Sequence, residues 1–231
     1  MRFLKDIVKE DIVDKIDKTF NVSRVDSAID IETKLFVCDV KWLKVGDTII
    51  DNEERPASIR EVGINYIVVR KLEPFIWTSN IFTAFKDFYF IAGTPLDVDA
   101  EWLKRSIVQT SKLPLFWLAL PTNETINANG QGLERESVIR LFIIEQSMLK
   151  YTVDEYYSEV MKYLMAYLEA FKDAIKKNKL FANIESFDQR ELYRLGSESQ
   201  DGFEALIIDS NLSAIEIRFT LPIRKGAKCL C

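Results

Sequence analysis

The most restrictive pattern in the sequence is a long amphipathic segment that begins at Thr152 and continues to about Lys177. Thr152 and Glu155 have the spacing of a capping box, in which each side chain bonds to the backbone N–H of the other at the first turn of a helix. Apolar residues then recur at three- and four-residue spacing: Val153, Tyr156, Tyr157, Val160, Leu164, Tyr167, Leu168, Phe171 and Ile175. The segment therefore predicts a long helix whose apolar stripe packs on another element of the fold.

Strands are predicted on both sides of this helix. Leu113–Leu120 and Val138–Ser147 are strand-like segments that precede it, and Phe203–Asp209 and Ser213–Leu221 form a predicted hairpin that follows it. Pro95–Thr110 has the pattern of a shorter helix ahead of the first strand. This order of elements predicts an α+β fold in which helices pack on one antiparallel sheet.

The N-terminal part of the chain predicts a different structure. Residues 1–20 have apolar residues at helical spacing, and residues 21–30 are polar. The segment that follows has short apolar runs separated by turn signals, which is typical of a small antiparallel β-barrel or β-sandwich. The predicted organisation is an N-terminal helix and linker (1–33), a small inserted β module (34–92), an α+β domain (93–223) and a basic tail (224–231).

A long polar stretch, Pro121–Ser137, separates the two strands that precede the long helix. It is rich in Asn, Gly, Thr and Glu and is predicted to be a loop. A loop of this length inside a compact domain is uncommon and is usually functional or ordered by a partner. We therefore predict that it contacts a partner. The residues predicted to make that contact are Asn123, Glu124, Asn127, Asn129, Gln131, Glu134, Arg135 and Glu136.

Positive charge gathers at two places near the C-terminus. Four lysines stand at or just past the end of the long helix, where positive charge suits the helix dipole: Lys172, Lys176, Lys177 and Lys179. The chain then ends in a basic segment without apolar periodicity. Such a tail is either solvated or in contact with phosphate or an acidic protein surface. The residues predicted for such contacts are Arg224, Lys225 and Lys228.

Composition limits the function classes that need consideration. The 231 residues include 31 basic and 36 acidic side chains and no histidine, for a net charge of −5. This balance is unlike that of a basic nucleic-acid binder, and the commonest general base and metal ligand is missing. No apolar run approaches the roughly 20 residues of a membrane span, and the charged N-terminus lacks the apolar core of a signal peptide. Cys38, Cys229 and Cys231 make a poor disulfide framework and predict reduced thiols in a cytosolic setting.

Two groups of acidic residues could support metal-dependent chemistry. Asp97, Asp99 and Glu101 could hold Mg²⁺ for phosphoryl transfer, but acidic residues are also expected where a helix begins, and the structural interpretation is preferred. Glu204 and Glu216–Arg218 have some similarity to a nuclease-type sheet, in which an acidic residue and a lysine lie close together on a strand. Arginine stands in place of that lysine here. The three cysteines are one ligand short of a structural zinc site. No catalytic residue, metal site or cofactor is predicted, and the chain is not expected to be an enzyme.

The arrangement from Leu113 to Ile223 resembles the connector, neck and tail-terminator ring proteins of tailed bacteriophages. The segments that carry the resemblance are Leu113–Leu118, the polar stretch Thr122–Ser137, the strand Val138–Gln146, the helix Thr152–Lys177 and the closing strand Ile215–Pro222. The resemblance implies a helix-flanked sheet in each subunit, an extended loop toward the lumen or a neighbour, and closed rings of about six or twelve copies. The sequence is also similar in style to the stacked neck rings of short-tailed, crAss-like gut phages. The region 34–92 departs from the minimal version of this fold.

The resemblance implies a structural virion protein that forms a homo-oligomeric ring in the head-to-tail connector or tail. Its expected partners are other connector, portal or tail proteins. DNA would pass through the ring without sequence-specific binding. The protein is expected to need no cofactor and no membrane. The net charge of −5 per copy would repel DNA phosphates if it faced the lumen. Assembly is expected in the bacterial host cytoplasm. Two alternatives stay open: a metal-dependent phosphodiesterase or nuclease, and a monomeric protein-binding module.

Overall fold

The computed structural model describes residues 3–26, 31–40, 42–102, 112–126, 133–148, 150–193, 195 and 212–224. The chain divides into two compact units. Unit 1 consists of Met1–Ile16 together with Phe88–Cys231, and unit 2 is Asp17–Asp87. The sequence predicts the small β module at residues 34–92. Unit 2 begins before that range, at Asp17, and also ends before it does, at Asp87. The chain is an α+β protein with a small inserted β-barrel, as the sequence predicts.

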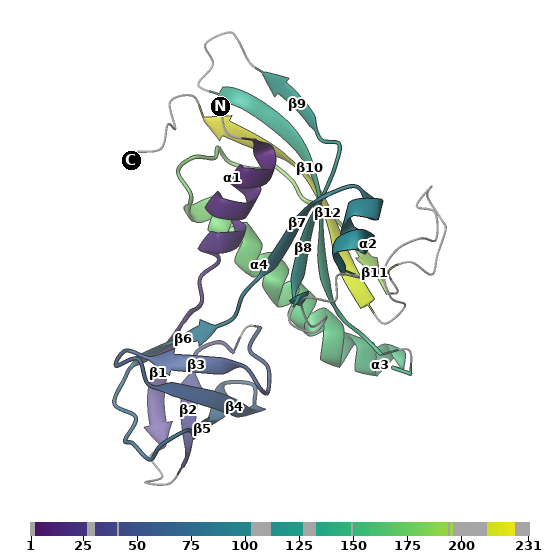
Figure 1. Cartoon of the computed structure of the whole chain (residues 1–231). Helices are drawn as coiled ribbons and strands as arrows, with labels where there is room; N and C mark the ends of the chain where they lie inside the picture. Colours follow the sequence, from purple (N-terminus) through teal and green to yellow (C-terminus); the bar gives the residue numbers. More distant parts are fainter. Residues whose placement is uncertain are drawn as a thin grey trace. The chain divides into compact units, whose positions relative to one another are not determined.

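Unit 1 is built on a six-stranded sheet (Figure 1). Its strands are β7 (Tyr89–Gly93), β8 (Leu115–Ala119), β9 (Asn123–Ile126), β10 (Leu133–Gln146), β11 (Asp188–Leu192) and β12 (Leu212–Arg224). The order is β11-β12-β10-β8-β7, and β9 pairs with β10 beside β8. All pairs are antiparallel except β7 with β8. That pair is parallel because the connection between its strands includes the helix α2 (Pro95–Trp102), whereas a tight turn would have reversed the direction of the chain.

The predicted long helix is present, and its capping box is confirmed. It runs through α3 (Val153–Tyr156), a π-helical turn η3 (Tyr157–Met161) and α4 (Lys162–Lys177). The Thr152 hydroxyl accepts from the Glu155 backbone N–H at 3.3 Å, and the Glu155 carboxylate accepts from the Thr152 N–H at 2.8 Å. Leu164, Tyr167, Leu168, Phe171 and Ile175 are buried along α4, which packs on β10 and β12.

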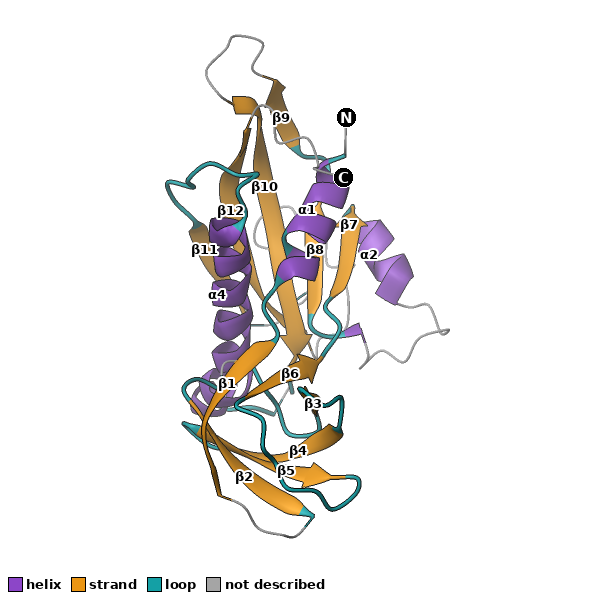
Figure 2. Ribbon diagram, turned by 90° about the vertical axis from the view of Figure 1, so that its left-hand side faces the viewer, coloured by secondary structure: helices purple, strands orange, loops and turns teal. Residues whose placement is uncertain are grey.

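A second helix covers the same face of the sheet. Helix α1 (Leu4–Asp11) and the short 3₁₀ turn η1 (Val13–Lys15) lie beside α4, as Figures 1 and 2 show together. The Asn178 side chain donates to the Asp11 carbonyl at 2.9 Å and joins the two helices at their ends. The helix predicted over residues 1–20 is too long, because the helical part ends at Lys15 and strand β1 begins at Thr19.

The opposite face of the sheet is covered at one end by α2. Trp117 on β8 stacks on Phe142 of β10 with ring centroids 4.4 Å apart, and its indole N–H donates to the Gly93 carbonyl at 2.9 Å. Val98 and Trp102 of α2 belong to the same buried cluster. Because β8 is buried on both faces, it reads in the sequence as a continuous apolar run and not as an alternating one.

Unit 2 is a closed six-stranded antiparallel barrel. Its strands are β1 (Thr19–Asp26), β2 (Glu32–Val37), β3 (Thr48–Asp51), β4 (Pro56–Val62), β5 (Tyr66–Lys71) and β6 (Ile81–Phe85), in the order β1-β2-β5-β4-β3-β6. Phe20 stacks on Phe82 at 5.1 Å and meets the edge of Trp42 at 5.4 Å inside the barrel. Residues 85–91 are divided between the two units, since β6 closes the barrel and β7 belongs to the sheet of unit 1.

Candidate subunit-contact surfaces

The polar stretch predicted as a loop contains two strands. β9 and the first part of β10 form an antiparallel ladder in which Asn123 is opposite Val138 and Ile126 is opposite Arg135. On its other side, the same part of β10 pairs with the end of β12, so that Leu133 is opposite Arg224. Figure 1 shows this three-stranded extension, which we call the arm, reaching past the ends of β7 and β8. The loop prediction is therefore wrong for Asn123–Ile126 and for the residues from Leu133 onward, because polar side chains alternate along these strands in place of apolar ones.

The structure separates the predicted contact residues by face. Glu124 and Arg135 lie on the side that carries Ser137, and the Arg135 guanidinium is 3.3 Å from the Glu124 carboxylate. The Arg135 side chain is only 5% exposed, so it is held within its own chain. Asn123 is exposed and Glu136 is partly exposed on the other side of the arm. Asn127, Asn129 and Gln131 lie outside the described residues, as does the side chain of Glu134.

The outer edge of β9 is open in the described part of the chain. There β9 pairs with β10 alone, and its residues Asn123, Glu124 and Thr125 are exposed. An open edge presents backbone N–H and C=O groups that can pair with an extended segment of another chain. The arm therefore offers to a neighbour a β-strand edge and an outer face that carries Asn123, Glu136 and the half-exposed Val138.

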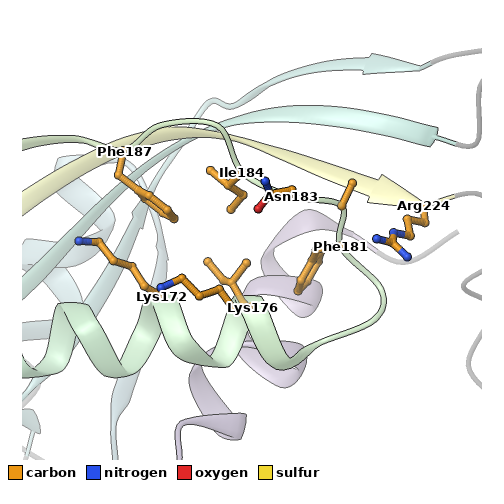
Figure 3. Close-up of a pocket in the computed structure, with 9 residues that line it drawn as sticks. Lys172, Lys176, Phe181, Asn183, Ile184, Phe187 and Arg224 are labelled. Carbon is orange, nitrogen blue, oxygen red and sulfur yellow. The ribbon is translucent and has the colours of Figure 1, made fainter.

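A groove of about 250 Å³ lies at the C-terminal end of α4 (Figure 3). Helix α4 contributes Lys172 and Lys176, and β12 contributes Arg224 at its end. The segment after α4 contributes three apolar side chains: Phe181, Ile184 and Phe187. No carboxylate lines the groove among the residues that are described. We call this surface the basic groove.

Backbone pairing fixes one wall of the basic groove. The Ala182 N–H donates to the Pro222 carbonyl at 2.9 Å, and the Arg224 N–H donates to the Leu180 carbonyl at 3.0 Å. The segment after α4 is thereby held along the last residues of β12. Arg224, which the sequence placed in a basic tail, is the last residue of this strand. Lys225 and Lys228 lie outside the described residues.

The lysines of the basic groove form their ion pairs within their own helix in the part of the chain that the structure describes. Lys172 is 2.8 Å from Glu169 and 5.5 Å from the centre of the Phe187 ring. Lys176 is 3.7 Å from Asp173, and both side chains of that pair are mostly exposed, so the pair is weak. The groove therefore keeps a net positive character beside apolar side chains. Sequence reasoning missed it because Arg224 and the end of β12 are far in the chain from α4 and the segment that follows it.

The acidic group at α2 is engaged in local structure. The Asp97 carboxylate accepts from the Thr94 hydroxyl at 2.8 Å and from the Thr94 N–H at 2.7 Å, and these bonds lower the pKa of Asp97. Glu101 accepts from the Tyr89 hydroxyl at 2.7 Å, and this bond raises the pKa of Tyr89 to about 12. Asp99 is partly buried. No group of three potential metal ligands was found among the described residues.

Glu216, the acidic strand residue considered above for a nuclease, is bound by two arginines. Glu216 on β12 is 3% exposed, and its Oε1 atom accepts from the Nε atoms of Arg140 and Arg218, both at 2.6 Å. A carboxylate held in this way is part of a structural ion pair that joins β10 to β12. Glu204 lies outside the described residues.

A scan against protein-family models found no match, and a search of curated proteins found no relative. Within the described ranges, no helix is long and apolar enough to span a membrane.

Proposed function

We propose that this chain is a structural virion protein that forms a ring in the head-to-tail connector or tail of a tailed bacteriophage. The proposal begins from the resemblance of Leu113–Ile223 to connector and tail-terminator proteins. The observation that supports the proposal most strongly is the open edge that β9 presents in the arm, beyond the body of the sheet.

A ring requires one surface of a subunit to meet a different surface of the next, with a rotation that closes on itself. The arm suits that requirement because an edge strand can pair with an extended segment of a neighbour. The exposed residues of the edge strand β9 are polar, which keeps an unpaired edge from aggregating before assembly. Glu136 is the charged residue of the outer face that is best placed to contact a neighbour.

The charge of the chain is also compatible with a passage for DNA. Each copy carries a net charge of −5, so about six to twelve copies carry several tens of negative charges. Negative charge around a lumen repels phosphates and reduces non-specific retention of DNA. In this role the protein docks on portal, connector or tail proteins, and its location is the virion.

The test is negative-stain imaging of the purified chain and of a Glu136→Lys variant. We expect closed rings with a central hole for the unmodified chain and loss of rings for the variant, because a reversed charge on the arm opposes the contact. Asp87→Lys is the matched control, since Asp87 is 95% exposed and changes the net charge by the same amount. Rings formed by the Glu136→Lys variant would remove the arm from the contact, and separate particles of the unmodified chain would contradict the ring itself.

A further inference from the structure

An exposed group of apolar and aromatic side chains lies at the start of the long helix. Val153 is 66% exposed, Tyr157 is 51% exposed and Tyr193 is 37% exposed. Met148, in the turn that precedes the helix, is 52% exposed. Large apolar side chains that gather on a surface in this way often mark an interaction site. We call this group the tyrosine patch.

Short contacts hold the tyrosine patch together. The Tyr157 hydroxyl donates to the Glu191 carboxylate at 2.9 Å, which raises the pKa of Tyr157. The buried Tyr156 ring lies 5.5 Å from the ring of Tyr157 and 4.4 Å from that of Tyr193. The Tyr193 hydroxyl donates to the Tyr151 carbonyl at 2.9 Å. The side chains are thus ordered before any partner binds, which lowers the entropy lost on association.

The backbone at the tyrosine patch is also unusual. Tyr157–Met161 forms a π-helical turn inside an otherwise α-helical segment. Such turns are rare and occur often at functional sites.

The two ends of the long helix carry opposite charge. From Met148 to Met161 the sequence has three carboxylates, Asp154, Glu155 and Glu159, and one lysine. From Lys172 to Lys179 it has four lysines and one aspartate. Glu191 adds a further carboxylate that touches the tyrosine patch. The patch is therefore apolar with acidic neighbours, and the basic groove is apolar with basic neighbours.

The basic groove has a suitable size for a side chain. Its volume of about 250 Å³ is below the range of roughly 300–1,000 Å³ that is usual for small-molecule sites. It is open along the helix, and Phe181, Ile184 and Phe187 form its apolar wall. An aromatic side chain with a carboxylate beside it would bury its ring against this wall and place its charge near Lys172 or Lys176.

The tyrosine patch cannot reach the basic groove of its own chain. The helix rises about 1.5 Å per residue, so Tyr157 of the patch and Lys172 of the groove are roughly 22 Å apart along it. Both surfaces belong to unit 1, which is a single compact body. A contact between them must therefore join two copies of the chain.

We propose that the tyrosine patch of one copy docks into the basic groove of the next copy. This contact is heterologous, because it joins two different surfaces, and repetition of it around an axis closes a ring. It rests on the proposed ring function and adds a second pair of surfaces to the contact made by the arm, and both contacts are needed to hold two copies together. Tyr157 supplies the central aromatic side chain, and Asp154 and Glu191 face the lysines of the neighbour.

The test uses two variants that each remove one side of the contact. Tyr157→Ser removes the aromatic side chain from the tyrosine patch and keeps the basic groove, and Lys176→Glu reverses a charge in the groove and keeps the patch. Measured by light scattering, each variant alone is expected to have the mass of one subunit, about 27 kDa. An equimolar mixture is expected to form a pair of about 54 kDa that cannot grow, since the intact patch and the intact groove are then on different chains.

Lys15→Glu is the matched control, because Lys15 is exposed on η1 and belongs to neither surface. It should assemble like the unmodified chain. Circular dichroism verifies that all variants keep their helix content. Rings in either single variant would overturn this contact while leaving the ring function intact. A mixture that stays at the mass of one subunit would also overturn it, and an unmodified chain that stays monomeric would overturn both proposals.

Discussion

Phe171 is the residue through which the packing of α4 on the sheet can be tested most sharply. Its side chain is fully buried. Its ring lies 6.0 Å from that of Phe116 on β8, in a stacked arrangement, and 6.1 Å from that of Phe219 on β12, edge to face. It therefore contacts two strands of the sheet from a single helical position.

Phe171→Ala removes the ring and leaves a cavity between these three elements. Truncation of a buried phenylalanine costs about 3–5 kcal/mol of unfolding free energy. For a unit of this size, that corresponds to a fall of roughly 6–20 °C in Tm. Phe171→Leu keeps most of the volume and is expected to cost less than about 1.5 kcal/mol from the volume change. Both variants lose the ring contacts with Phe116 and Phe219, so the alanine variant should be the less stable of the two by the cost of its larger cavity.

The assay is urea unfolding followed by tryptophan fluorescence, to which Trp102 and Trp117 contribute from unit 1 and Trp42 and Trp77 from unit 2. Because Lys172 follows Phe171 directly, a loosened helix also disturbs the basic groove, and Phe171→Ala should weaken assembly as well as stability. A loss below about 1 kcal/mol for Phe171→Ala, or equal losses for the alanine and leucine variants, would refute the packing described for α4.

Two further predictions concern charge. Hydrogen bonds from Thr152 lower the pKa of Glu155, so the contribution of this carboxylate to stability is present above the usual glutamate range and is lost as the pH falls through the lowered pKa. The Tm difference between the unmodified chain and Glu155→Gln should therefore shrink between neutral pH and about pH 3. A constant Tm difference would contradict the capping role. Glu216→Gln leaves Arg140 and Arg218 without their shared carboxylate and should cost about 1–3 kcal/mol in urea unfolding, a value kept low because both arginines are partly exposed and can turn to water. Glu159→Gln, at an exposed position on the same long helix, is the control and should change stability by less than about 0.5 kcal/mol.

Local signals explain which elements the sequence predicts well. The helix after Thr152 is predicted because its cap and its apolar stripe both lie within consecutive residues. The strand β8 is predicted as an apolar run because it is buried on both faces. By contrast, β1 and β9 carry mainly polar side chains and lack a clear apolar alternation, so the sequence predicts helix end and polar linker for β1 and a loop for β9.

The candidate surfaces depend even more on distant parts of the chain. The lysines of the basic groove were explained by the helix dipole, and Arg224 was assigned to a tail. The groove itself exists because backbone pairing brings Leu180–Ala182 beside the end of β12. The tyrosine patch includes Tyr157, which helical periodicity assigned to the buried stripe but which is half exposed at a π-helical turn.

The central claim is that copies of this chain assemble into a closed ring, and the absolute mass of the purified, unmodified chain tests it most directly. Light scattering after size-exclusion chromatography, over a range of concentrations, gives that mass without a shape assumption. One copy has a mass of 26.8 kDa, so a ring of six copies is expected at about 160 kDa and one of twelve at about 320 kDa. A single discrete mass of that kind is the predicted result. A mass of about 27 kDa at every concentration would contradict the account.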